Sequence, residues 1–172
     1  MVRLPLVALS LAIACLCRPA AAQPAAEEAV RAAMVFNFLK FTEFPAEAVP
    51  DPQRLRLCYS VAEPVQADAL AALSGRKLGS RELVVMRLGE RGDGCQVLYV
   101  DSRQRWDAAL ESRGIGTPLT IGSYRGFVAD GGMIEMDLQN DGTRFEINLA
   151  QARLAHFHMS PQLLRLARRI HE

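Results

Sequence analysis

The sequence predicts a single-domain α/β sandwich, in which a mostly parallel sheet with a C-terminal β-hairpin carries helices on both faces. Two patterns lead to this fold class. Between residues 54 and 122, short apolar runs alternate with segments of helix length, as they do in parallel sheets covered by helices. After residue 132, two segments with a period of two flank Asn140-Asp141-Gly142, which is a strong hairpin turn signal. Residues 23–172 have the length of one domain with one core.

The first helix is expected over residues 27–41, where apolar side chains recur at helical spacing on more than one side. Such a helix is either buried on several sides in the core or also in contact with a partner chain. In the second case Phe36 and Leu39 are the candidate partner-binding residues.

The remaining elements follow from apolar spacing and from turn residues, with proline opening helices and glycine ending them. The expected strands are residues 54–60, 82–88, 96–101, 118–122, 133–138 and 143–149, and the expected helices are residues 64–73, residues 103–113 and a terminal helix that starts at Ser160 and Pro161 and continues through Ile170.

Residues 1–22 have the pattern of a secretory signal peptide. Arg3 precedes an apolar run that ends at Cys17, and Ala20-Ala21-Ala22 supplies the small-residue cleavage site. The run is shorter than the roughly 20 apolar residues of a membrane span. We therefore expect cleavage after Ala22 and a periplasmic mature domain, with lipidation at Cys15 as the alternative.

Cys58 and Cys95 are the two cysteines that remain after such a cleavage. An even pair in an oxidising compartment indicates a disulfide. The pair is either a structural bridge or a redox-sensing dithiol.

Charge and motif content argue against nucleic-acid binding and against catalysis. The chain has 20 Lys and Arg against 19 Asp and Glu, and a signal peptide would remove Arg3 and Arg18, which leaves a formal charge near −1. Such a charge gives no attraction to nucleic acid. No nucleophile elbow or phosphate loop is present, and His156 and His158 lack supporting metal ligands. The sequence therefore predicts a non-enzymatic protein without metal or cofactor.

Acidic side chains on the two hairpin strands, Glu135, Asp137 and Glu146, are expected on a solvated face. Ligands of open parallel sheets bind beyond the carboxyl ends of the strands. Ser60, Asp101 and Ser123 would lie at that edge and form a ligand crevice.

Three arginines of the terminal helix, Arg165, Arg168 and Arg169, form a basic face. They would either bind an acidic partner or complement the helix C-terminus.

Several segments resemble the YfiR-like family of periplasmic proteins. They are residues 32–45 (AAMVFNFLKFTEFP), 55–58 (LRLC), 94–100 (GCQVLYV), 126–134 (GFVADGGMI), 144–149 (RFEINL) and 159–164 (MSPQLL). The resemblance covers nearly the whole mature chain. It departs from the family pattern in having one cysteine pair, in Phe44 where the family usually has Trp, and in His156-Phe157.

The resemblance implies an α/β sandwich that forms a homodimer and in which Cys58 pairs with Cys95. It also implies a repressor that binds the periplasmic sensor region of an inner-membrane diguanylate cyclase, lowers cyclic di-GMP and biofilm output, and works with an outer-membrane lipoprotein. The alternative function is a periplasmic small-molecule-binding accessory of another envelope sensor or of a histidine kinase.

Overall fold

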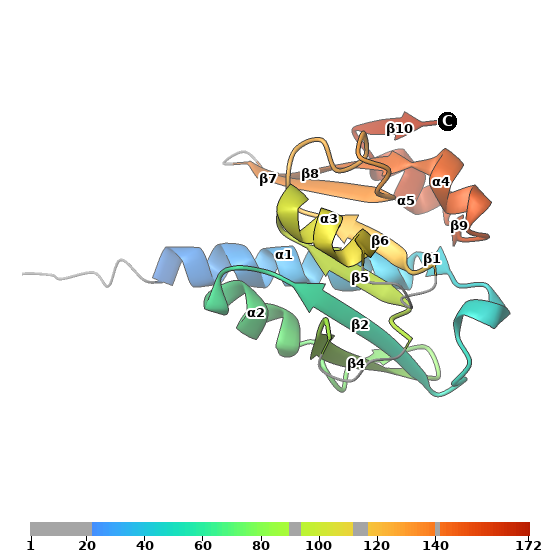
Figure 1. Cartoon of the computed structure of the whole chain (residues 1–172), viewed down its shortest axis with the longest axis horizontal. Coiled ribbons are helices and arrows are strands. Elements are labelled where there is room, and N and C mark those ends of the chain that lie inside the picture. The colour runs from blue at the N-terminus through green and yellow to red at the C-terminus, as the bar shows by residue number, and fades with distance from the viewer. Residues whose placement is uncertain (1–21, 90–93, 112–116, 140–141) are drawn as a thin grey trace, which may run out of the picture.

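The computed structural model describes residues 22–89, 94–111, 117–139 and 142–172 (Figure 1). The predicted signal peptide up to residue 21, together with Cys15, lies outside the described residues. Across the described ranges, none of the helices combines the length and the hydropathy of a membrane span.

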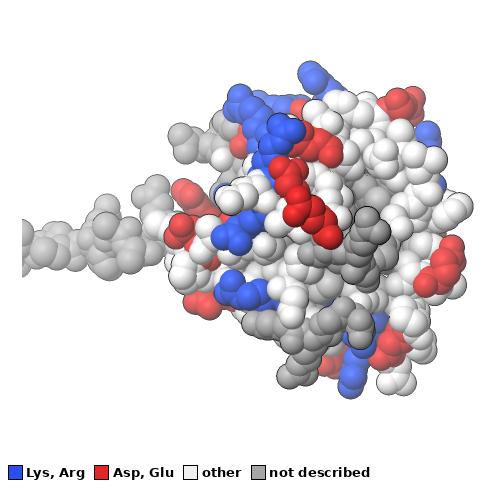
Figure 2. Space-filling view, viewed as in Figure 1, with Lys and Arg blue, Asp and Glu red and all other residues white. Residues whose placement is uncertain are grey.

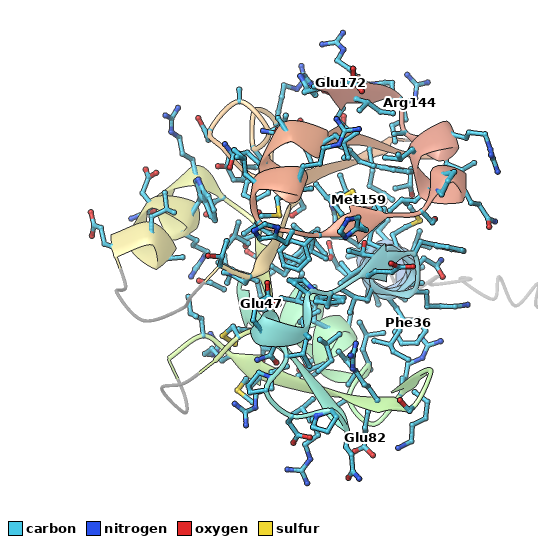
Figure 3. All side chains as sticks on the ribbon, turned by 90° about the vertical axis from the view of Figure 1, so that its right-hand side faces the viewer. Phe36, Glu47, Glu82, Arg144, Met159 and Glu172 are labelled. Atoms are coloured by element: carbon cyan, nitrogen blue, oxygen red, sulfur yellow. A yellow bond between two sulfur atoms is a disulfide. The ribbon has the colours of Figure 1, made fainter. Side chains whose placement is uncertain are left out.

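A sheet in the strand order β10-β8-β7-β6-β5-β2-β4-β3 forms the centre of the described structure. Strands β4, β2, β5, β6 and β7 run parallel, β8 returns antiparallel to β7, and β10 runs parallel to β8. Figure 3 shows the strands next to the two ends of this order, with Glu82 of β4 at the bottom and Arg144 of β8 near the top. The sheet strands are β2 (Arg54–Ser60), β3 (Lys77–Leu78), β4 (Arg81–Arg87), β5 (Val97–Val100), β6 (Leu119–Gly122), β7 (Ile134–Gln139), β8 (Gly142–Asn148) and β10 (Arg169–His171).

Helices cover both faces of this sheet, so the predicted fold class is confirmed (Figure 1). One face packs against four helices through a large shared core, and the other face packs against α3 through a smaller core. The helices are α1 (Ala22–Lys40), α2 (Pro64–Ala71), α3 (Arg103–Glu111), α4 (Leu149–Leu154) and α5 (Pro161–Leu166), with a 3-10 turn at η1 (Ala46–Ala48).

The larger core depends on α1, whose side chains Val35 and Phe38 are buried. The ring of Phe38 meets the ring of Phe145 on β8 edge-on, with 5.0 Å between centroids. The prediction of a helix buried on several sides is confirmed, although α1 begins at Ala22 and not at Glu27. Through this contact, the apolar face of the β7–β8 hairpin packs into the same core as the parallel strands.

The C-terminal segment differs from the predicted helix. Helix α5 ends at Leu166, and Ala167 is extended with φ −67° and ψ 135°. The Arg168 N–H then donates to the Phe145 carbonyl at 2.8 Å, and Arg169–His171 pair with β8. The helical stripe predicted through Ile170 is therefore wrong beyond Leu166, because the edge of β8 offers backbone partners that a continued helix would leave unpaired.

Besides β10, the short strands β1 (Thr42–Glu43), β3 and β9 (His158–Met159) and the helix α4 were not predicted from the sequence. Strand β1 follows α1 and pairs antiparallel with β9. Between β8 and β9 lies α4, whose N-cap Asn148 accepts a hydrogen bond from the Gln151 N–H. The β1–β9 pair and α4 join the C-terminal segment to the end of α1.

The predicted disulfide between Cys58 and Cys95 is present, with Cα atoms 5.7 Å apart. It links β2 to the residues that lead into β5, and Cys58 is buried in the smaller core. The bridge therefore fastens neighbouring parallel strands on the face that α3 covers.

We expect the double variant Cys58→Ala/Cys95→Ala to fold with a free energy of unfolding lower by about 3–4 kcal/mol. The reason is that the bridge closes a loop of 37 residues and so restricts the unfolded chain. Denaturant unfolding followed by circular dichroism measures the loss. Reduced wild-type protein is the control and should unfold like the variant; unchanged stability in both would contradict the structural role.

Candidate functional site

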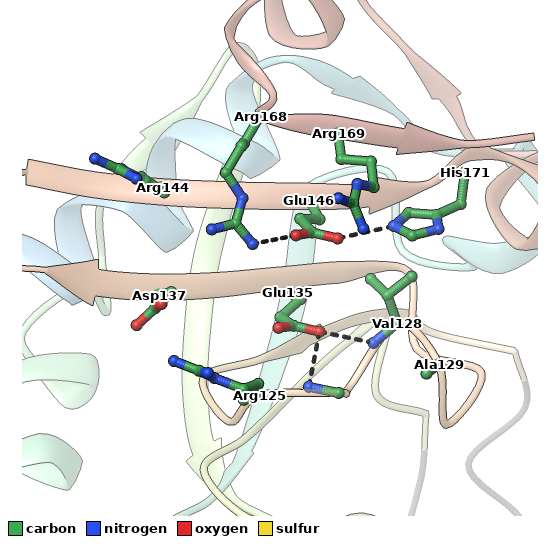
Figure 4. Close-up of a pocket in the computed structure, with 11 residues that line it drawn as sticks. Arg125, Val128, Ala129, Glu135, Asp137, Arg144, Glu146, Arg168, Arg169 and His171 are labelled. Atoms are coloured by element: carbon green, nitrogen blue, oxygen red, sulfur yellow. Dashed lines mark hydrogen bonds and ion pairs between the residues drawn. The ribbon is translucent and has the colours of Figure 1, made fainter.

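A cavity of about 440 Å³ opens on the outer face of β7, β8 and β10, the face that the larger core does not occupy (Figure 4). The side chains around it are mainly charged. They include Arg125, Glu135, Asp137, Arg144, Glu146, Arg168, Arg169 and His171. Figure 2 shows acidic and basic side chains gathered together toward this end of the molecule.

The period of two in the hairpin places these charges on one face. Ile134 and Met136 on β7 and Phe145 and Ile147 on β8 are buried in the larger core, so the residues between them point to the opposite side. There Glu135 lies opposite Glu146, and Asp137 lies opposite Arg144. The register thus brings two carboxylates directly across from each other. Such a like-charge pair is destabilising unless hydrogen-bond donors or cations lie beside each carboxylate.

Glu135 is compensated by the loop that follows β6. Its Oε2 accepts hydrogen bonds from the backbone N–H groups of Gly126 and Val128, both at 3.1 Å. Glu135 is only 8% exposed, so the expectation that it is solvated is wrong. The carboxylate instead satisfies backbone donors that would otherwise be buried without partners.

Phe127 anchors the same loop from the other side. Its ring is fully buried and meets the rings of Trp106 and Tyr124 edge-on, with centroids 5.0 Å and 5.4 Å away. A Cβ atom at Gly122 or Gly132 would overlap this ring. Glycine at both positions leaves the space in which the ring sits, and the loop is thereby fixed over the sheet.

Asp130 secures the end of the loop. The Tyr124 hydroxyl donates to Asp130 Oδ2 at 3.0 Å, and Arg103 lies 3.2 Å from Asp130 Oδ1. The Trp106 Nε1–H donates to the Asp130 carbonyl at 3.1 Å. Burial and the nearby Asp130 raise the pKa of the Tyr124 hydroxyl, so this hydroxyl remains a donor at neutral pH.

Glu146 is compensated by the C-terminal strand. Arg168 donates to its Oε1, and the Nε2 atom of His171 lies 2.8 Å from its Oε2. Hydrogen bonds from Arg168 and His171 lower the pKa of Glu146, against the opposing effect of burial. At 8% exposed, Glu146 also contradicts the expected solvated position. It is the carboxylate that joins β10 to the hairpin.

Of the predicted partner-binding residues, the structure brings Arg168 and Arg169 to the rim of the cavity and places Arg165 exposed on α5. Phe36 and Leu39 are buried in the larger core, at 7% and 4% exposed. The guanidinium of Arg76 lies over the Phe36 ring, 3.8 Å from its centroid. Neither apolar side chain offers an open surface in this structure.

The predicted ligand crevice residues do lie at one edge of the sheet. Arg105 connects two of them: its Nε is 3.2 Å from Asp101 Oδ1, and its Nη1 donates to the Ser60 hydroxyl at 3.5 Å. Asp101 Oδ2 also accepts the Ala62 N–H at 2.6 Å. The Ser123 side chain is hydrogen-bonded to the buried Tyr99 hydroxyl. These contacts fasten the edge internally.

The described residues contain no group of three or more His, Cys, Asp or Glu side chains that is arranged to hold a metal ion. His156 lies in the turn after α4 with φ 60°, and His158 is on β9.

The comparison with known families decides the classification. The YfiR/HmsC-like family matches residues 28–168, from the first turns of α1 to the residue before β10. The chain belongs to this family. The resemblance inferred from the sequence is thus confirmed. No curated protein matches the chain.

Sequence reasoning missed the pairing of Glu135 with Glu146. The signal was present in the hairpin turn, since a turn that closes at Gly142 fixes the register of both strands. The donors that compensate the two acids, the loop backbone for Glu135 and the C-terminal side chains Arg168 and His171 for Glu146, come from separate segments, and no local sequence pattern indicates them.

Replacement of Gly132 by Ala should lower the free energy of unfolding by roughly 1–3 kcal/mol, because the added methyl group overlaps the Phe127 ring. The measurement is a double-mutant cycle with Phe127→Ala, read by denaturant unfolding. Removal of the ring removes the overlap, so the double variant should lose less than the two single losses added together. Strict additivity would contradict the assigned packing.

Glu146→Gln should remove part of the acid sensitivity of the fold. Because the pKa of Glu146 in the folded state lies below its usual value of 4.5, its stabilising contribution is complete above that value and is lost as the pH falls through the folded-state pKa. Melting temperatures recorded from neutral pH downward measure it, with exposed Glu111→Gln as the control. A variant that keeps the acid dependence of wild type would contradict this assignment.

Proposed function

We propose that this chain is a periplasmic regulatory protein that binds the periplasmic sensor region of an inner-membrane diguanylate cyclase and lowers cyclic di-GMP and biofilm output. The observation that carries the proposal is the family match over residues 28–168, which includes the loop and hairpin that build the cavity. The signal-peptide pattern of residues 1–22 supports the location.

The chemistry of the candidate site favours binding over catalysis. A general base needs a free lone pair and a pKa suited to its task. Both oxygens of Glu146 are hydrogen-bonded, to Arg168 and to His171, and Glu135 holds two backbone N–H groups through its Oε2. The pKa of Glu146 is lowered, which makes it a weaker base.

We assign the partner surface to the C-terminal unit formed by α4, α5 and β10, because large apolar side chains are exposed there beside cations. Leu154 is 73% exposed and Leu166 is 66% exposed. Arg165 and Arg169 are exposed on the same unit. The buried cores of protein interfaces are more apolar than the rest of the surface and are enriched in arginine. This unit takes the role that the sequence had suggested for Phe36 and Leu39.

A homodimer belongs to the same proposal. Strand β10 is the edge strand of the sheet, and its Ile170 is 37% exposed. An exposed strand edge offers unpaired backbone groups to a second chain. An outer-membrane lipoprotein as a second partner rests on the family resemblance alone.

The experiment that tests the function is measurement of cellular cyclic di-GMP in a strain that lacks the gene, with and without a restored copy. We expect the level to rise on deletion and to return on restoration. An unchanged level under several growth conditions would contradict regulation of a cyclase.

The surface assignment has its own test in the restored strain. The double variant Leu154→Glu/Leu166→Glu should leave cyclic di-GMP high, because two buried charges would oppose docking of the partner. The matched control is Leu110→Glu on α3, which is 60% exposed and lies on the other side of the sheet. Circular dichroism confirms folding of each variant. Full repression by the folded double variant would contradict the assigned surface.

A further inference from the structure

We propose that the cavity over β7, β8 and β10 binds a small organic dianion, a dicarboxylate or a phosphate monoester, through the guanidinium groups of Arg125 and Arg169. This inference goes beyond regulation of a cyclase and does not depend on it.

The walls of the cavity are fixed before any ligand arrives. Its floor is the β7–β8 hairpin, whose opposite side is packed into the larger core. Its roof is the loop that contains Gly126 and Val128, which is fixed by Glu135 and by the Phe127 ring. A preformed cavity of about 440 Å³ falls within the roughly 300–1,000 Å³ typical of small-molecule sites.

The two buried carboxylates are stabilised by groups of the same chain and need no cation from solution. Glu135 accepts from two backbone N–H groups, and Glu146 accepts from Arg168 and lies against His171. Asp137 faces Arg144 across the hairpin. The acidic part of the lining is therefore compensated from within the chain.

Two arginines of the cavity lining, Arg125 and Arg169, can still bind an anion from solution. Within the described ranges, neither Arg125 nor Arg169 lies within salt-bridge distance of a carboxylate, and the charge of Arg169 contributes only a minor part of the lowered pKa of Glu146. In Figure 4, Arg125 comes from the loop on one side of the two acids, and Arg169 comes from β10 on the other side. Two guanidinium forks on opposite sides suit a ligand with two negative charges, and each fork can hold a carboxylate or phosphate group through paired hydrogen bonds.

Other ligand classes fit the cavity less well. A nucleic acid needs cations along an extended track, whereas these arginines surround one cavity in a chain of nearly balanced charge. A metal cation would have to displace Arg168 and His171 from Glu146, and the described residues hold no group of three or more side chains arranged to ligate a metal.

Binding should also fasten β10. Strand β10 pairs with β8 alone, and the contacts of Arg168 and His171 with Glu146 add to this pairing. A ligand held between Arg125 and Arg169 would add a connection between β10 and the loop. We therefore expect the ligand to raise the melting temperature as well as to bind.

The test uses the full mature chain and two probes, succinate and inorganic phosphate, with sodium chloride at matched ionic strength as the reference. Isothermal titration calorimetry should show saturable binding of at least one probe in the millimolar range or tighter. At about 100 times the dissociation constant, the melting temperature should rise by roughly 5–10 °C.

Arg125→Ala and Arg169→Ala should each weaken binding about tenfold, the loss expected for one charge-assisted pair. The control is Arg153→Ala, an exposed arginine on α4 away from the cavity lining. Should Arg169→Ala loosen β10, Arg125→Ala remains decisive, and Arg125→Lys should bind between wild type and alanine.

Absence of saturable binding by both probes would overturn the proposal, as would an equal loss in the Arg153 variant. Binding of a hexaglutamate peptide without binding of either small probe would also overturn it, and would assign the rim to an acidic segment of a protein partner.

Discussion

The register of the β7–β8 hairpin is the constraint on which the candidate site depends. A shift by one residue would exchange the two faces of each strand. It would bring Glu135 and Glu146 toward the core that Phe38 and Phe145 now fill. The free energy lost by moving apolar side chains out of the core and carboxylates into it fixes the register. The fixed register then places two carboxylates opposite each other on the outer face.

The like-charge pair in turn organises segments far away in the sequence. Two carboxylates in a half-enclosed position are stable only when donors surround them. One set of donors is the backbone of the loop after β6, and the other is the side chains of the C-terminal strand. The loop needs the two glycines that accommodate Phe127, and the strand needs helix α5 to end early. The cavity is the space between the loop after β6 and the C-terminal strand, which each supply donors to one of the two acids.

Much of the fold was predictable because its signals are local. The residues of β2 and the alternation of the hairpin strands specify their elements within windows of a few residues, and the two remaining cysteines suggested their own pairing. The C-terminal strand was not predictable in this way. Its Arg168 and Ile170 continue a helical spacing, and only the open edge of β8 makes the extended conformation better.

The site was predictable only in fragments for a related reason. Arg168 and Arg169 were recognised as a basic group, but on a helix face and not at the rim of a cavity. The sequence suggested that Phe36 could contact a partner chain. In the structure, Arg76, from the turn after α2, covers the Phe36 ring. Burial of Glu135 depends on a loop that is separated from it by several residues and held by its own aromatic cluster. Such pairings are tertiary, and composition or periodicity does not encode them.

Arg169 links the two proposed binding events. It lies at the rim of the cavity and also belongs to the C-terminal unit that carries the exposed leucines. A ligand that draws its guanidinium into the cavity would remove that cation from the partner surface while it fastens β10. A partner that engages the same guanidinium would weaken the ligand by an equal free energy, since coupling between two binding equilibria is reciprocal. The position of one arginine on an edge strand and at the rim of a cavity would thus let a small anion set the strength of a protein contact.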